Sequence, residues 1–97
     1  MNMANAFIPY GSYWSTPFAK WQGPLANLNS IRLAAAVGRP WLEARPAARE
    51  RIDLGILGIT NIQHGSFYGL PWLTGMLGLE SVAGPTVQQA CATSARV

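Results

Sequence analysis

Charge is scarce in this 97-residue chain. Only 11% of its residues are charged and 49% are hydrophobic, whereas soluble domains carry roughly 25% charged residues. No charged residue lies between Leu54 and Leu79, and most of the charged residues lie between Arg32 and Asp53. The net charge is +3, but the basic residues are few and are mixed with acidic ones, which disfavours nucleic-acid binding. We therefore expect a buried uncharged span and no nucleic-acid partner.

Long apolar runs are missing too. Glycines and Pro71 interrupt the uncharged span, so no stretch of about 20 apolar residues remains to cross a membrane. No Lys or Arg precedes Lys20, and no continuous apolar segment lies before it. The pattern therefore predicts neither a secretory signal nor an Arg-rich transit peptide in these residues. We expect a cytoplasmic protein without a membrane partner.

The chain has one cysteine, Cys91, and one histidine, His64. A single cysteine forms no internal disulfide, which agrees with a reducing compartment. One His, one Cys and scattered acids also lack the spacing of metal ligands. His64 lies in a Gly-containing segment and is interpreted as a loop or packing residue, with a catalytic base as the alternative.

Three helices are expected. The first begins at Asn29 or Ser30 as N-cap, and Pro40 should kink or break it by removing a backbone hydrogen bond. Its apolar face should comprise Ile31, Ala34, Ala35, Gly38 and Leu42. The second covers residues 70–78, with Pro71 in its first turn and Gly78 at its C-terminal cap. The third begins near Cys91 and is cut off after about one turn.

The segments between these helices predict short strands. "FIPY", residues 7–10, is interpreted as the end of a strand, and "LGILGIT", residues 54–60, as a strand buried on both faces. A third strand is expected over residues 86–88, and residues 45–53 are expected to form an exposed link. Strands thus alternate with helices, which predicts a layered α/β fold with parallel strands. Because the last helix is so short, we expect an incomplete domain, the front of a longer protein.

Cys91 allows two interpretations. Single cysteines are often buried and behave as small apolar residues. A cysteine at a helix N-terminus is instead activated, because unpaired backbone N–H groups favour the thiolate. The same N–H groups can stabilise an oxyanion, an effect worth about 3 to 4 kcal/mol for one good donor. The small residues after Cys91 would leave room for an acyl group.

Three segments carry a resemblance to the thiolase family of coenzyme A-dependent acyltransferases. They are "TPFAKWQG" at residues 16–23, "LGITNIQHG" at residues 57–65 and "QQACATSA" at residues 88–95. The last is similar to the family's nucleophile motif and is the most specific of the three. Gln89 and Ala90 replace the usual polar lead-in, and Ser94 stands where a glycine is common. The resemblance runs from about Phe7 to Val97.

The resemblance implies that residues 1–97 are part of a thiolase N-terminal domain, truncated shortly after the nucleophile. It implies a layered α-β-α fold and a homodimer or tetramer in the complete protein. Cys91 would be the catalytic residue that takes the acyl group of an acyl-CoA substrate as a thioester, with its own backbone N–H helping to hold the oxyanion. No further cofactor or metal is implied. The family's catalytic His and second Cys have no counterpart in this chain, so the chain alone should be inactive.

Two other classes of protein remain open. A non-catalytic relative could keep the fold and bind a lipid or an acyl carrier. Alternatively, the chain could be a small interaction module whose N-terminal aromatic residues form a partner surface. The four tryptophans, Trp14, Trp21, Trp41 and Trp72, are expected to pack in the core, with the lining of a pocket as the alternative.

Overall fold

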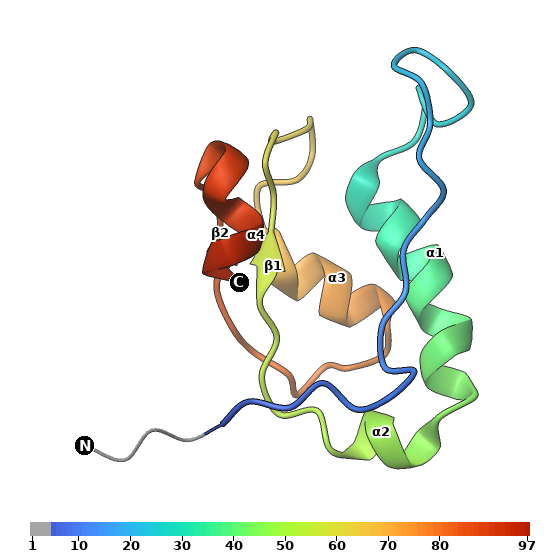
Figure 1. The fold of residues 1–97 in the computed structure, drawn as a ribbon, viewed down its shortest axis with the longest axis vertical. Helices are drawn as coiled ribbons and strands as arrows, with labels where there is room; N and C mark the ends of the chain where they lie inside the picture. The colour runs from blue at the N-terminus through green and yellow to red at the C-terminus, as the bar shows by residue number, and fades with distance from the viewer. Residues whose placement is uncertain (1–4) are drawn as a thin grey trace.

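The computed structural model describes residues 5–97. Helices dominate it, and a small sheet of two strands lies among them (Figure 1). In chain order the elements are α1 (Ser30–Glu43), α2 (Pro46–Glu50), β1 (Leu57–Gly58), α3 (Leu70–Met76), β2 (Thr86–Val87), the 3₁₀ turn η1 (Ala90–Ala92) and α4 (Thr93–Arg96). The protein is therefore a mixed structure of helices and parallel strands, as the alternating pattern predicted.

The N-cap of α1 is Asn29, as predicted. Its side-chain oxygen accepts hydrogen bonds from the backbone N–H groups of Ile31, at 2.9 Å, and Arg32, at 3.3 Å. Four of the five residues expected on the apolar face are buried: Ile31, Ala35, Gly38 and Leu42. Of the predicted kink or break at Pro40, the break is wrong, because α1 continues through Pro40 to Glu43. Pro40 is exposed, and so is Ala36, whose carbonyl loses its helical partner and can bond water instead.

Helix α3 ends as its sequence predicts. Gly78 has φ +72°, a left-handed conformation that glycine adopts without strain. The N–H of Leu79 bonds to the carbonyl of Thr74 at 2.8 Å, and the N–H of Gly78 to that of Gly75 at 3.2 Å. These two bonds form a Schellman motif, which satisfies the last carbonyls of the helix.

Strands β1 and β2 are parallel, with α3 between them in the chain. Leu57 lies opposite Thr86 and Gly58 opposite Val87, and a bridge between Leu54 and Ala83 extends the pairing. Strand residues alternate between two faces. A Cβ added to Gly58 would meet Thr93 at 2.8 Å, whereas one added to Gly55 would meet Leu70 of α3 at 3.1 Å. Helix α4 thus covers one face of the sheet, while α1 and α3 lie on the other side (Figure 1).

The prediction of a strand over residues 54–60 buried on both faces is wrong. Only Leu57–Gly58 is assigned as a strand, and Leu54 and Ile56 are 61% and 46% exposed. Both side chains point to the face of Gly58, where the single turn of α4 is too short to cover them. Ile59, which points to the opposite face, is buried. The burial of these side chains therefore depends on how much of each face of the sheet is covered by helix.

Two further expectations are corrected. Residues 7–10 form no strand, and residues 5–29 as a whole contain neither helix nor strand. The link over residues 45–53 contains α2, which starts at Pro46 because proline suits the first turn of a helix. The N-terminal segment runs along α1 (Figure 1), with the Trp14 ring 3.7 Å from where a Cβ on Gly38 would lie.

The core is small. Leu42, Leu79 and Val82 form its buried centre, and Trp41, Ile52 and Leu77 pack around it. The prediction that all four tryptophans pack in the core is wrong for Trp14 and Trp21, which are 42% and 83% exposed. The rings of Trp41 and Trp72 are partly buried beneath the guanidinium groups of Arg45, at 4.3 Å, and Arg32, at 5.2 Å.

Candidate functional site

Cys91 is exposed and lies in η1, in the short connection between β2 and α4. The sequence predicted a strand that leads into a helical turn at this cysteine, and the structure confirms that local arrangement. The alternative of a small buried apolar residue is wrong, because the side chain is open to solvent. The catalytic role of Cys91 stays a prediction.

The backbone before Cys91 adopts an uncommon conformation. Ala90 has φ +47°, a left-handed conformation that costs an L-residue about 1 to 2 kcal/mol. This conformation turns the chain sharply as it leaves β2, so that η1 and α4 fold back onto Gly58 of β1. Strain of this kind persists only where neighbouring contacts hold it.

Thr93 supplies those contacts. Its side chain is 3% exposed, and its hydroxyl accepts a hydrogen bond from the N–H of Gln89 at 2.9 Å. The same hydroxyl donates to the carbonyl of Ala90 at 2.7 Å. One buried side chain thus ties together the residues on both sides of Cys91.

The backbone donors of the turn are unequal. The N–H of Ala92 donates to the carbonyl of Gln89 at 2.9 Å, and that of Thr93 donates to the carbonyl of Ala90. Within residues 5–97 the N–H of Cys91 has no hydrogen-bond acceptor. The N–H of Ala90 has no acceptor among these residues either. The N–H of Cys91 is the donor that the thiolase resemblance assigns to the oxyanion.

His64 lies in an exposed turn between β1 and α3. Its carbonyl oxygen accepts a hydrogen bond from the Asn29 side chain at 3.4 Å. Its position in a loop was predicted, and no hydrogen bond between its imidazole and Cys91 is present in the described part of the chain. The described residues therefore do not pair His64 with the sulfur.

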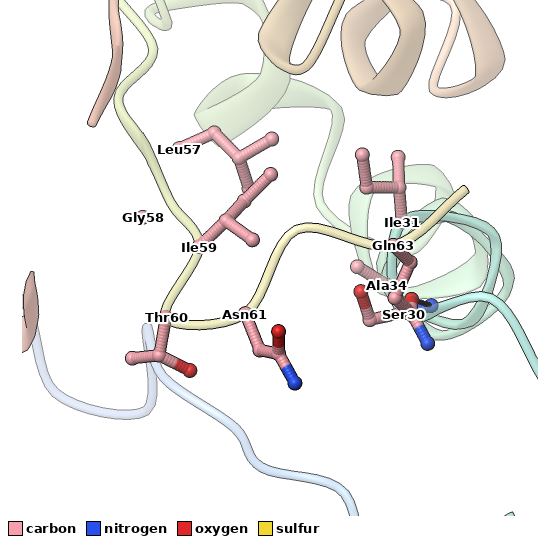
Figure 2. Close-up of a pocket in the computed structure, with 9 residues that line it drawn as sticks. All are labelled: Ser30, Ile31, Ala34, Leu57, Gly58, Ile59, Thr60, Asn61 and Gln63. Atoms are coloured by element: carbon pink, nitrogen blue, oxygen red, sulfur yellow. Dashed lines mark hydrogen bonds between the residues drawn. The ribbon is translucent and has the colours of Figure 1, made fainter. Parts of the chain in front are cut away.

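A cavity of about 410 Å³ opens between the start of α1 and the outer edge of β1 (Figure 2). Leu57 of β1 and Ile59, which directly follows β1, point toward the side where Ile31 of α1 lies, and Thr60 and Asn61 line the polar end (Figure 2). At that end Gln63 accepts a hydrogen bond from the N–H of Ser30. Cys91 does not line this cavity, so the cavity forms no single site with the sulfur.

Sequence reasoning missed Ala90 and Thr93 as parts of the site. Nothing in an alanine signals a left-handed conformation. Thr93 did carry a signal, because a Thr hydroxyl commonly bonds the carbonyl three residues earlier in a turn. Its spacing of two residues after Cys91 would have identified it as the residue that holds the turn.

Comparison with protein-family models, curated proteins and solved structures finds no match to this chain. In residues 5–97 no three His, Cys, Asp or Glu side chains gather where they could hold a metal ion. No helix in the same part of the chain has the length and apolar character needed to cross a membrane.

Proposed function

We propose that this chain is the N-terminal part of a thiolase-like acyltransferase and that Cys91 is its nucleophile. The layered thiolase fold, the homodimeric or tetrameric assembly and a cytoplasmic location belong to the same proposal. The observation that carries it is the position of Cys91, an exposed sulfur directly after a parallel strand, with its own backbone N–H unpaired. The sequence motifs around residues 16–23, 57–65 and 88–95 support it independently.

The reaction is a transfer between thioesters. The Cys91 sulfur loses its proton and attacks the carbonyl carbon of an acyl-CoA, so that a new carbon–sulfur bond forms. The bond from that carbon to the coenzyme A sulfur breaks, and coenzyme A leaves as a thiolate that takes up a proton. The N–H of Cys91 stabilises the negative oxygen of the tetrahedral intermediate. The acyl group then passes from Cys91 to a second acceptor.

General acid–base groups contribute about 10² to 10⁴ in rate to such reactions. The family's catalytic His and second Cys have no counterpart in this sequence, which has one histidine and one cysteine. We place these groups elsewhere in a complete protein. The 97-residue chain should accordingly accept an acyl group slowly and should not turn over.

Thiol chemistry tests the proposal. We expect iodoacetamide to label Cys91 faster in the folded chain than in the same chain unfolded in urea, because the proposal requires the fold to activate this sulfur as a nucleophile. Incubation with acetyl-CoA should add one acetyl group, detected by intact mass, and the C91S variant should add none. Labelling no faster than in urea, together with no acetyl adduct, would contradict the nucleophile assignment.

The second candidate is a binding protein of the same fold, without catalysis. An uncharged cavity lined by Ile59, Ile62 and Phe67 beside β2 favours it. This candidate predicts slow labelling of Cys91 and no acetyl adduct, with an apolar ligand still bound. The labelling rate therefore separates the two.

A further inference from the structure

A second cavity, of about 290 Å³, lies between β2 and the loop over residues 61–69. Four apolar side chains line it: Ile59, Ile62, Phe67 and Val87. Ile59 is 8% exposed, whereas Ile62 and Phe67 are 65% and 89% exposed. The cavity thus has a buried apolar side chain among its lining residues and large apolar side chains that face solvent.

The polar side chains of the lining are already engaged. The Ser66 hydroxyl accepts from Asn29 at 3.4 Å, and the Thr86 hydroxyl accepts from the N–H of Leu70 at 2.8 Å. The Gln88 amide donates to the carbonyl of Thr60 at 3.0 Å. No charged residue lines the cavity. A ligand would therefore gain mainly from burying hydrocarbon, and an ionic or strongly polar group would find no partner.

The cavity lies close to Cys91 along the chain. Thr86, Val87 and Gln88 line it, and Cys91 follows Gln88 by three residues. The two α-carbons are therefore no more than about 11 Å apart. Cys91 itself is not among the lining residues, so the link between the sulfur and the cavity is part of the proposal and not of the observed geometry.

We infer that this cavity binds the unbranched apolar chain of an acyl group of medium length. An apolar cavity of about 150 Å³ accommodates benzene, with its six carbons, so the volume of about 290 Å³ here suits up to roughly twelve carbon atoms. This inference rests on the proposed function for the link to Cys91. Binding of the chain itself depends only on the cavity.

Straight-chain carboxylates test it in the C91S variant, where no thioester can form. We expect the dissociation constant, measured by titration calorimetry, to fall about fourfold for each methylene added between butyrate and octanoate. The gain should stop beyond about twelve carbons, because further methylenes would remain in water. Affinity that is independent of chain length over this series would overturn the inference.

Two isoleucines provide a matched pair of variants. Ile62→Asp places a carboxylate at the cavity and should weaken octanoate binding at least tenfold. Ile56→Asp changes another exposed isoleucine, 46% exposed, which lies outside the cavity lining, and should leave binding unchanged. Equal effects of the two changes would refute the site. Circular dichroism melting of both variants shows whether either one loses its fold, and Val87→Trp, which fills the cavity, provides a second block of binding.

The outcomes separate this inference from the proposed function. Acetylation of Cys91 without any dependence of carboxylate binding on chain length would sink the inference and leave the nucleophile in place. Octanoate binding that is lost in Ile62→Asp, in a chain whose Cys91 is never acetylated, would sink the acyl transfer and leave a lipid-binding site.

Discussion

Ala90, which directly precedes the candidate nucleophile Cys91, has a strained left-handed backbone conformation. Its φ of +47° is penalised by about 1 to 2 kcal/mol in an L-residue, a penalty that glycine escapes. Glycine also destabilises the folded state by about 0.5 to 1 kcal/mol relative to alanine, because its unfolded chain has more conformational entropy to lose. Ala90→Gly should therefore be neutral or stabilising by up to about 1 kcal/mol, and Ala90→Val should be destabilising. Thermal midpoints at a fixed protein concentration measure both; a clear loss of stability in Ala90→Gly would contradict the assigned conformation.

Thr93 should matter through its hydroxyl more than through its shape. Thr93→Val keeps the volume but leaves the Gln89 N–H without its acceptor and removes one of the two donors to the Ala90 carbonyl, at a cost of about 1 to 3 kcal/mol. Thr93→Ser keeps the hydroxyl and should cost less. The same pair should affect iodoacetamide labelling of Cys91, because the turn loosens only when the hydroxyl is lost. Equal labelling rates and equal melting temperatures for Val and Ser would show that Thr93 does not position the turn.

The contact between α4 and β1 depends on the absence of a side chain at Gly58. A Cβ at this position would lie 2.8 Å from Thr93 and 2.9 Å from Val97. Such overpacking costs about 1 to 3 kcal/mol, so Gly58→Ala should destabilise the protein and expose the amides of α4 to hydrogen exchange. Gly75→Ala is the matched control, because the added methyl meets nothing within 4 Å in α3. It should instead stabilise the helix by up to about 1 kcal/mol, and the same sign for both changes would contradict this packing.

The elements that the sequence predicted are those fixed by local chemistry. The Asn29 cap, the apolar face of α1 and the Gly78 terminus each depend on residues within a few positions of one another. The predictions that were wrong concern features that depend on contacts with segments distant in the sequence. A strand over residues 54–60 was judged by its composition, but its burial depends on how much helix lies on each face.

The site divides in the same way. The strand and turn on either side of Cys91 could be predicted, because Gly84 and Pro85 end one segment and small residues open the next. The left-handed conformation of Ala90 could not, because it is imposed by the hydrogen bonds of Thr93 and by the packing of α4 on Gly58. Likewise, the lining of the cavity beside β2 combines residues from β2 with a loop about 20 positions earlier, a contact that no local pattern encodes.

At the scale of the whole molecule, the solvent-accessible surface is larger than that expected of a compact monomer of the same mass. The accessible area is 7962 Å², whereas a compact monomer of 10.5 kDa exposes about 5,400 Å². The radius of gyration is 14.5 Å, against about 12.5 Å for a compact chain of this length. The excess of roughly 2,500 Å² is comparable to what an obligate interface removes from one partner. Much of it is apolar, since Phe7, Tyr10, Phe18 and Trp21 are each more than 80% exposed.

This excess surface predicts that the isolated chain associates with itself. Apolar area of this extent is unfavourable in water by roughly 25 cal/mol per Å², so contact between copies is favoured even at low concentration. Sedimentation velocity should show species heavier than 10.5 kDa, and a double variant, Phe18→Asp with Trp21→Asp, should shift them toward the monomer. Asn27→Asp is the control, because it adds negative charge at an exposed position of the same segment without removing apolar surface. A wild-type chain that stays monomeric at every concentration and unfolds cooperatively would show instead that these 97 residues are a self-sufficient module, and the assignment to part of a larger acyltransferase would fall with that result.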